Sequence, residues 1–305
     1  MTSSSIPPYP SIYALGHPAI KGLFDTPVLI EEKVDGSQLS FLRTADGVTH
    51  VRSKGKDQTE DTDGLFRRAV EVVRGLDLTP GWVYRAEYLE RPKHNTLAYS
   101  DIPRNHLALF DVEVPNDMGG WDFMAYREKA AAAHWLGISV APALFEGQLN
   151  GQELTTLLGS LLQTKSFLGG PPIEGVVIKN YAFHTRYDRI GLAKHVSEAF
   201  KESHKADWGT RHPSRGDLVA NLATAYRTEA RWQKAVQHLR EDGALVGDPR
   251  DIGPLIKAVL QDVRNECADE IKEALFEHCW RDIGRGLTTG LPEWYKQKIF
   301  EDATL

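Results

Sequence analysis

One lysine near the start of the chain lies in a setting that suits covalent chemistry. Lys33 follows two glutamates and precedes Val34, Asp35 and Gly36. A lysine amine is ordinarily a protonated cation, so its use as a nucleophile requires burial or a nearby positive charge that lowers its pKa. Gly36 lets the backbone come close to a ligand. Lys33 is therefore a candidate nucleophile, and the alternative is a surface lysine in a hairpin, because a short Lys-x-Asp-Gly match often arises by chance.

Other charged residues occur at the ends of predicted strands or inside them. Arg52 opens a basic segment with Lys54 and Lys56 that can meet a phosphate, although many such clusters are only solvated loops. Glu87 lies among the aromatic residues of a predicted strand, where it is either a paired structural acid or a ligand contact. Asp111 interrupts a strand that is otherwise apolar. These residues are further candidates for a ligand site.

Strand and helix patterns alternate over the first two thirds of the chain, which predicts an α+β fold. The predicted strands cover residues 28–30, 39–42, 48–52, 82–89, 107–114, 138–145, 173–179 and 191–197. The predicted helices cover residues 65–76, 121–136 and 154–162. Gly137 follows the second of these helices and suits a left-handed cap. The charged candidates must be positioned mainly by the strands.

The pattern changes after about Ser203, where strand alternation ends. Apolar residues at helical spacing predict helices over residues 217–239, 251–263 and 269–280. The sequence therefore predicts two domains, with residues 1–203 forming the larger and residues 204–305 forming a helical one. Met1 to Pro10, rich in Ser and Pro, is predicted to be a loose tail.

Composition excludes several classes of protein. The chain has 305 residues, 41% of them apolar and 26% charged, and no apolar run approaches the roughly 18 residues of a membrane span. The first ten residues lack the pattern of a signal peptide, and Cys267 and Cys279 are the only cysteines, which together predict a cytoplasmic protein with reduced thiols. The net charge of −6 argues against non-specific nucleic-acid binding, so any such binding requires local basic patches.

The charged candidates also occur in a fixed order along the chain. The ordered segments are Lys33-Val34-Asp35-Gly36, Arg52-Ser53-Lys54, Glu87, Phe110-Asp111-Val112, Glu174-Gly175-Val176-Val177-Ile178-Lys179 and Lys194. This order resembles the covalent nucleotidyltransferase superfamily of ATP-dependent polynucleotide ligases and mRNA capping enzymes. DNA ligases and capping enzymes usually add an OB barrel of short alternating strands, whereas this chain adds helices. It is therefore most similar to the RNA ligase 2 group.

The resemblance implies an ATP-dependent RNA ligase that joins 5′-phosphate and 3′-hydroxyl RNA ends. Such an enzyme acts in RNA repair. Lys33 would form a lysyl-AMP intermediate, and the AMP would then pass to the 5′ end. The implied fold is a nucleotidyltransferase (ATP-grasp-like ligase) domain of antiparallel sheets with flanking helices, followed by a smaller helical domain. The implied cofactors are ATP and Mg²⁺ or Mn²⁺, and the implied partners of a monomeric enzyme are RNA ends or a nicked duplex.

The resemblance also implies roles for individual residues. Glu174 would organise the metal, and Glu87 would contact the ribose or a metal-bound water. Phe110 would stack on the adenine, and Arg52 would contact the nucleotide sugar or the incoming RNA end. Lys194 would supply positive charge to the phosphates, because each displacement develops negative charge there. The other implied nucleotide contacts are Glu32, Asp35, Gly36 and Lys179.

One position departs from the family pattern. Relatives often carry Lys-x-Lys in the last segment, but here the first of these positions is Leu192. A local phosphate track is predicted from Lys54, Lys56, Arg85, Arg91, Lys93 and His94. The alternatives are a small ATP-dependent DNA ligase, a GTP-dependent capping guanylyltransferase, and a non-catalytic protein that binds nucleotides or RNA ends.

Overall fold

The computed structural model describes residues 6–54, 56–60, 64–185, 190–197 and 215–302. The chain divides into two compact units. Residues 1–202 and 229–259 belong to the first, and residues 203–228 and 260–305 belong to the second. The predicted domain boundary between residues 203 and 204 lies outside the described residues and stays a prediction.

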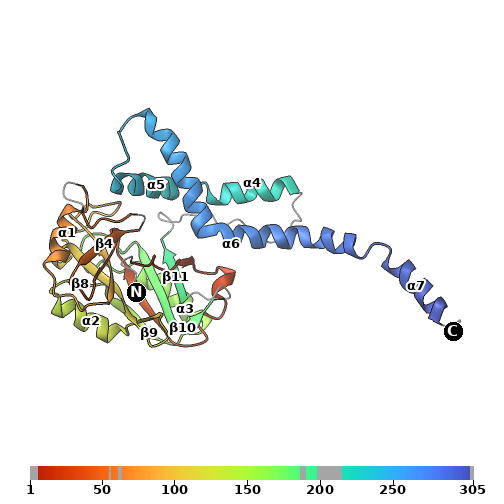
Figure 1. Cartoon of the computed structure of the whole chain (residues 1–305), viewed down its shortest axis with the longest axis horizontal. Coiled ribbons are helices and arrows are strands. Elements are labelled where there is room, and N and C mark those ends of the chain that lie inside the picture. Colours follow the sequence, from red (N-terminus) through yellow and green to blue (C-terminus); the bar gives the residue numbers. More distant parts are fainter. Residues whose placement is uncertain (1–5, 55, 61–63, 186–189, 198–214, 303–305) are drawn as a thin grey trace. The chain divides into compact units, whose positions relative to one another are not determined.

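The first unit contains two sheets (Figure 1). The nucleophile candidate ends a strand of the first. In spatial order this sheet consists of β1 (Tyr13–Ala14), β11 (Ile190–Val196), β10 (Gly175–His184), β2 (Val28–Lys33) and β9 (Ala143–Gly147). All neighbours are antiparallel except β1 and β11. Lys33 is thus the last residue of β2, beside the first residue of β10, Gly175.

The second sheet carries Arg52, Glu87 and Phe110. It runs β4 (Thr49–Ser53), β3 (Ser37–Arg43), β5 (Val83–Tyr88), β6 (Leu107–Pro115) and β7 (Trp121–Phe123), and β8 (Ser139–Val140) pairs in parallel with β6. The sequence enters this sheet directly from the turn after Lys33, because β3 begins only four residues later. The two sheets are therefore connected at the candidate site.

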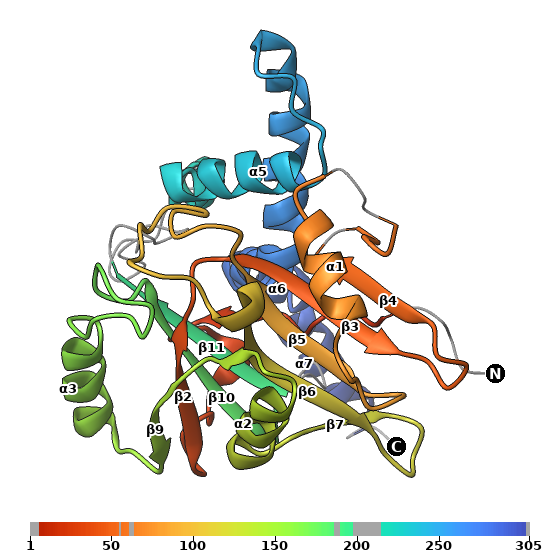
Figure 2. The same cartoon turned by 90° about the vertical axis from the view of Figure 1, so that its left-hand side faces the viewer.

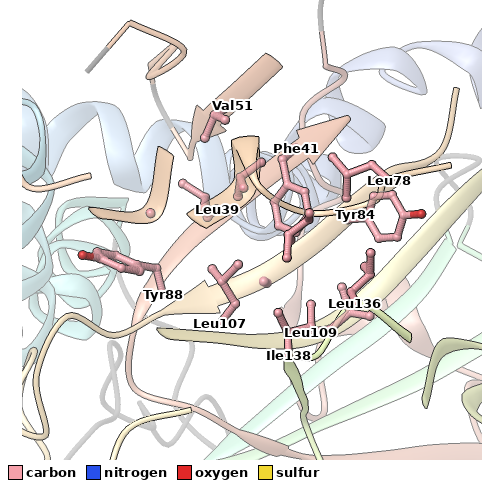
Figure 3. Packing of buried hydrophobic residues seen from close by; sticks show 14 of the residues in the cluster. Leu39, Phe41, Val51, Leu78, Tyr84, Tyr88, Leu107, Leu109, Leu136 and Ile138 are labelled. Carbon is pink, nitrogen blue, oxygen red and sulfur yellow. The ribbon is translucent and has the colours of Figure 1, made fainter. Parts of the chain in front are cut away.

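Helices cover one face of each sheet. Apolar residues of α1 (Arg67–Arg74) and α2 (Tyr126–Trp135) pack on the second sheet, and α3 (Gly151–Leu161) packs on the first (Figure 2). Phe41 and Tyr84 stack at a centroid distance of 5.5 Å in the core of the second sheet (Figure 3). The alternation of strand residues leaves the opposite faces for polar side chains.

The first unit also includes the helix α5 (Glu229–Glu241), and the second unit is helical. In the second unit, α4 (Arg215–Tyr226) packs against the later part of α6 (Ile252–Leu287), and α7 (Leu291–Asp302) follows. Cys267 is buried in this core, and both cysteines are free thiols. No described helix is long and apolar enough to span a membrane. The predicted α+β class with a helical C-terminal region is confirmed.

Several predicted boundaries are wrong. Residues 121–136 contain the strand β7 before the helix α2, since Trp121–Phe123 pairs with β6. Residues 138–145 form two strands in different sheets, because Pro142 interrupts the ladder.

The helical region was also divided wrongly. Residues 217–239 form the two helices α4 and α5, with a break at Arg227 and Thr228. Residues 251–280 contain one long helix, α6, because no glycine or proline separates the two predicted segments.

The predicted loose tail is wrong for the residues that the structure describes. Ile6 is buried against Leu42 and Val83 of the second sheet, and the Tyr9 hydroxyl donates to the carboxylate of Asp111. Met1–Ser5 lie outside the described residues. The segment from residue 6 to residue 10 is thus part of the domain.

Candidate active site

The antiparallel pairing of β2 with β10 brings Lys33 to Glu174. Nζ of Lys33 lies 2.6 Å from Oε2 of Glu174, although 141 residues separate them in sequence. Gly175, the residue after Glu174, lets β10 lie close to β11, since a Cβ atom there would lie 2.4 Å from the carbonyl oxygen of His195. The two predicted segments therefore meet as one ion pair.

The charges around Lys33 stabilise its protonated form. Burial lowers the pKa of Lys33, but the negative charges of Glu174, Glu87 and Asp35 outweigh burial, so the pKa of this lysine is raised. Burial raises the pKa of Glu174, partly offset by the positive charges of Lys33 and Lys194. These side chains alone do not produce the lowered lysine pKa that the sequence predicted. A reactive amine at Lys33 requires additional positive charge in the site.

Glu87 lies near the Lys33–Glu174 pair and has one carboxylate oxygen that accepts no hydrogen bond. It pairs across the strand with Gln38 on β3. Its Oε2 atom is buried and has no hydrogen-bond partner among the described residues. Burial is the main cause that raises the pKa of Glu87 to about 8. Such an acceptor suits a hydroxyl group or a metal-bound water.

The described residues contain no group of three or more His, Cys, Asp or Glu side chains in a metal-binding arrangement. A magnesium ion is commonly held by one or two carboxylates together with phosphates and water. Glu174 and Glu87 fit that pattern, because both lie beside Lys33 and one has an unpaired oxygen. Their role as metal ligands stays a prediction.

Hydrogen bonds hold the turn after Lys33 in place. Oδ2 of Asp35 accepts from the backbone N–H groups of Thr96 and Leu97 at 2.8 and 2.7 Å. The carbonyl oxygen of Gly36 accepts from Nδ2 of Asn95 at 2.7 Å. A Cβ atom on Gly36 would lie 2.9 Å from the backbone carbonyl oxygen of Tyr88, so the turn favours glycine. Asp35 and Gly36 therefore shape the site.

The two predicted lysines lie in different surroundings. Lys194 on β11 lies opposite Val177, half-buried, and its charge acts on Glu174. Lys179 is 2% exposed, and its Nζ atom lies 2.6 Å from Glu31 Oε2 and 3.0 Å from Asp111 Oδ2. Lys194 thus belongs to the Lys33 region, whereas Lys179 belongs to a buried charge cluster.

This buried charge cluster consists of Glu31, Asp111, Lys129 and Lys179, and sequence reasoning missed Lys129. Both ammonium groups donate to the carbonyl oxygen of Phe110, from Lys129 at 2.5 Å and from Lys179 at 2.6 Å. The hydroxyls of Tyr9 and Tyr181 donate to Asp111. The only signal in the sequence was the presence of acids inside apolar strands. Because Glu31 shares a strand face with Lys33, the cluster adjoins the nucleophile.

Phe110 and Arg52 are both covered by the N-terminal segment. The rings of Phe110 and Tyr9 meet edge to face at 5.2 Å, and Nζ of Lys179 lies 5.4 Å from the centroid of Phe110. Nη1 of Arg52 donates to the carbonyl oxygen of Ile6 at 2.8 Å. The predicted contacts of both residues with a nucleotide stay predictions.

Three other predicted positions point inward. Glu32 is 3% exposed and accepts from Ser166 Oγ at 2.5 Å and from the N–H of Phe167 at 3.1 Å. Arg85 is fully buried and donates to Glu113 at 2.7 Å, so its predicted place on an RNA-binding surface is wrong. Leu192 is fully buried opposite Lys179, where a second lysine would add another charge to the cluster.

Comparisons with known proteins identify one family. A profile of the RNA ligase family matches residues 26–196, which is more than half of the chain. A structure of a mutant Naegleria gruberi RNA ligase with ATP and Mn has 16% sequence identity and a TM-score of 0.47, and the match covers 67% of this chain and 60% of that chain. The chain thus spans less than two thirds of that relative's length.

A second structure is a putative ATP-dependent DNA ligase from Aquifex aeolicus, with 16% identity and a TM-score of 0.42. This match covers 92% of the present chain and 67% of the other. A comparison with curated protein sequences gives no match. The matched family segment contains Lys33, Glu87, Glu174 and Lys194. The chain belongs to the RNA ligase family.

Proposed function

We propose that the protein is an ATP-dependent RNA ligase that seals 5′-phosphate and 3′-hydroxyl RNA ends through a lysyl-AMP intermediate at Lys33. The observation that carries the proposal is the 2.6 Å contact between Lys33 Nζ and Glu174 Oε2, with Glu87 close by, in a chain of the RNA ligase family. A lysine paired with one acid and close to a second matches a site that receives a nucleotide with a divalent cation.

The first step would form a bond between Nζ of Lys33 and the α-phosphorus of ATP while pyrophosphate leaves. Lys33 must lose a proton first, and the neighbouring carboxylates oppose that loss. A divalent cation, when bound, would supply positive charge that favours the neutral amine and stabilises the phosphate oxygens. Glu174 and Glu87 would hold that cation.

The other family positions would then take the roles that the sequence implies. Lys194 would contribute positive charge near Glu174. Phe110, whose carbonyl oxygen accepts from the two lysines of the buried charge cluster, would form one wall of the nucleotide site. The AMP group would pass from Lys33 to the 5′-phosphate, and the 3′-hydroxyl would displace it. Arg52 would contact the nucleotide or the RNA end, and its Nη1 atom donates to the carbonyl oxygen of Ile6.

A labelling experiment tests the first step. The protein is incubated with labelled ATP or labelled GTP and with Mg²⁺ or Mn²⁺, and acid-labile label on the protein is measured. We expect label from ATP that is lost in Lys33→Ala and kept in the matched surface variant Lys165→Ala. Absence of an adduct, or an adduct that survives Lys33→Ala, contradicts the mechanism, and labelling by GTP alone favours a capping enzyme.

A sealing experiment tests the substrate. Nicked RNA, nicked DNA and single-stranded RNA with 5′-phosphate ends are offered under the same conditions. We expect the protein to seal RNA ends faster than it seals a nick in an all-DNA duplex. Preferential sealing of the DNA nick would replace the RNA assignment with a DNA ligase.

A further inference from the structure

The last turn of helix α5 is bound to the turn that follows the nucleophile. Nε2 of Gln237 donates to the carbonyl oxygen of Gly36 at 3.3 Å and to Oε1 of Glu241 at 2.8 Å. The hydroxyl of Ser37 donates to the same Glu241 carboxylate. Both parts belong to the first compact unit. Residues about 200 positions apart in sequence therefore meet three to four residues after Lys33.

Two acids at the end of α5 and just after it, Glu241 and Asp242, lie within electrostatic range of the basic segment that follows Arg52. Burial raises the pKa of Glu241, and the positive charge of Lys54 partly offsets it. Burial also raises the pKa of Asp242, partly offset by the charge of Lys56. Two carboxylates thus lie within electrostatic reach of two exposed lysines, in a part of the chain where the sequence predicts contacts with phosphates.

A polar pocket continues this surface. It lies between α5 and the loop after β5, and its lining includes Arg91, His94, Asn95, Arg240 and Glu241. Burial lowers the pKa of His94 to about 4, so this ring is neutral and takes part through its contact with the Ser37 hydroxyl. The two arginines supply positive charge here, beside the carboxylates of Glu90 and Glu241 in the same lining.

We propose that the Gly36–Ser37 turn together with Lys54 and Lys56 forms a docking face for the phosphodiester backbone of the RNA substrate. In this proposal Glu241, the last residue of α5, and Asp242 after it cover the face as phosphate mimics until RNA displaces them. The identity of the nucleic acid rests on the proposed function. The turn lies next to the nucleophile, because Ser37 is only four positions after Lys33.

The charges explain why such a cover would be removable. Partly exposed ion pairs between lysines and carboxylates are weak and are screened by salt. A polynucleotide brings several phosphates at once and releases condensed counterions when lysines neutralise them. The RNA backbone therefore offers these lysines a larger set of contacts than two nearby carboxylates do. In the absence of RNA, the hydrogen bonds from Gln237 to Gly36 and from Ser37 to Glu241 hold the end of α5 against this face.

The test measures RNA binding without ATP, so it does not depend on ligase chemistry. The full chain is titrated against a fluorescent 5′-phosphorylated oligoribonucleotide of about 20 nucleotides, followed by anisotropy at several salt concentrations. In the variant Glu241→Gln with Asp242→Asn, we expect the Kd at low salt to fall roughly three- to tenfold. The slope of log K against log salt should steepen by about one to two.

The matched control is Glu146→Gln with Glu229→Gln, which removes two exposed acids elsewhere in the first unit and changes the net charge equally. A Kd of the α5 variant equal to or above that of the control overturns the proposal. In the unmodified protein, RNA should increase hydrogen exchange at α5 amides, and unchanged or slower exchange also overturns it. If the protein does not bind RNA at all, the docking proposal fails, whereas the adenylylation of Lys33 is still tested separately by labelling with ATP.

Discussion

Nζ of Lys129 lies 2.5 Å from Oε1 of Glu31, and neither side chain reaches solvent. Asp111 and Lys179 complete the cluster, so removal of one ammonium group leaves two buried carboxylates with one lysine. Breaking a buried ion pair by removing one partner costs about 3–5 kcal/mol. We expect Lys129→Met to lower the free energy of unfolding by about this amount, measured by urea denaturation.

The control for this substitution is Lys165→Met on the protein surface. Lys165 is exposed, so its change should stay within about 0.5 kcal/mol. Equal stability of the two variants would show that the buried charge cluster does not contribute to the fold.

Gly175 directly follows Glu174 and lies where β10 comes close to β11. A Cβ atom there would lie 2.4 Å from the His195 carbonyl oxygen and 2.7 Å from Cα of Val196, both of them backbone atoms. The strands β10 and β11 must separate to accept it. We expect Gly175→Ala to destabilise the protein by about 1–3 kcal/mol and to reduce labelling by ATP, because Glu174 moves with the strand.

Gly159 in helix α3 is the matched control for Gly175. A Cβ atom at Gly159 meets no atom within 4 Å. Gly159→Ala should stabilise the protein by about 0.5–1 kcal/mol, since alanine favours a helix more than glycine does. If thermal unfolding showed the same change for both alanine variants, the argument from close strand approach would be wrong.

The strand-borne part of the site was predictable from sequence. Lys33 and Glu87 lie in strands whose alternation is visible in the chain, and Glu174 directly precedes β10. The pairing of β2 with β10 brings Lys33 and Glu174 together. The α+β class followed from the same patterns. Local periodicity determines these elements, so a single sequence is enough to find them.

The contacts made by distant segments were not predictable. Tyr9 reaches Asp111 from a Pro-rich segment with no periodic pattern, and Lys129 reaches Glu31 from a helix whose alanines give little amphipathic signal. The same limit applies to Arg85, which looked like a surface cation but is neutralised by Glu113 inside the sheet. Partners of buried charges depend on tertiary packing, which local patterns do not encode.

The raised pKa of Glu87 predicts a dependence of stability on pH. Its pKa in the folded protein is about 8, against an ordinary value of 4.5, so the folded state retains a proton that the unfolded state has lost. Because the folded state binds this proton more tightly, protonation of Glu87 stabilises the folded protein. This contribution to the free energy of unfolding is fully present below pH 4.5 and is lost as pH rises through about 8. The slope between these values is at most about 1.4 kcal/mol per pH unit.

The measurement compares unfolding free energies of the unmodified protein and Glu87→Gln from pH 5 to pH 9. We expect the variant to become more stable relative to the unmodified protein as pH rises, because the amide carries no titrating proton. A difference that stays constant with pH would place the Glu87 pKa near its ordinary value.

Glu174 has two effects that act in opposite directions, and a glutamine variant separates them. Its charge raises the pKa of Lys33, so its removal alone would free the amine and accelerate attack on ATP at neutral pH. If Glu174 also holds the cation, its removal should instead slow labelling by about 100-fold or more and raise the half-saturating metal concentration by about 10- to 100-fold. We expect the second result for Glu174→Gln, measured as the rate of labelling across Mg²⁺ and Mn²⁺ concentrations, with Glu146→Gln as the control. Full activity at every metal concentration would leave Glu174 only as the ion-pair partner of Lys33.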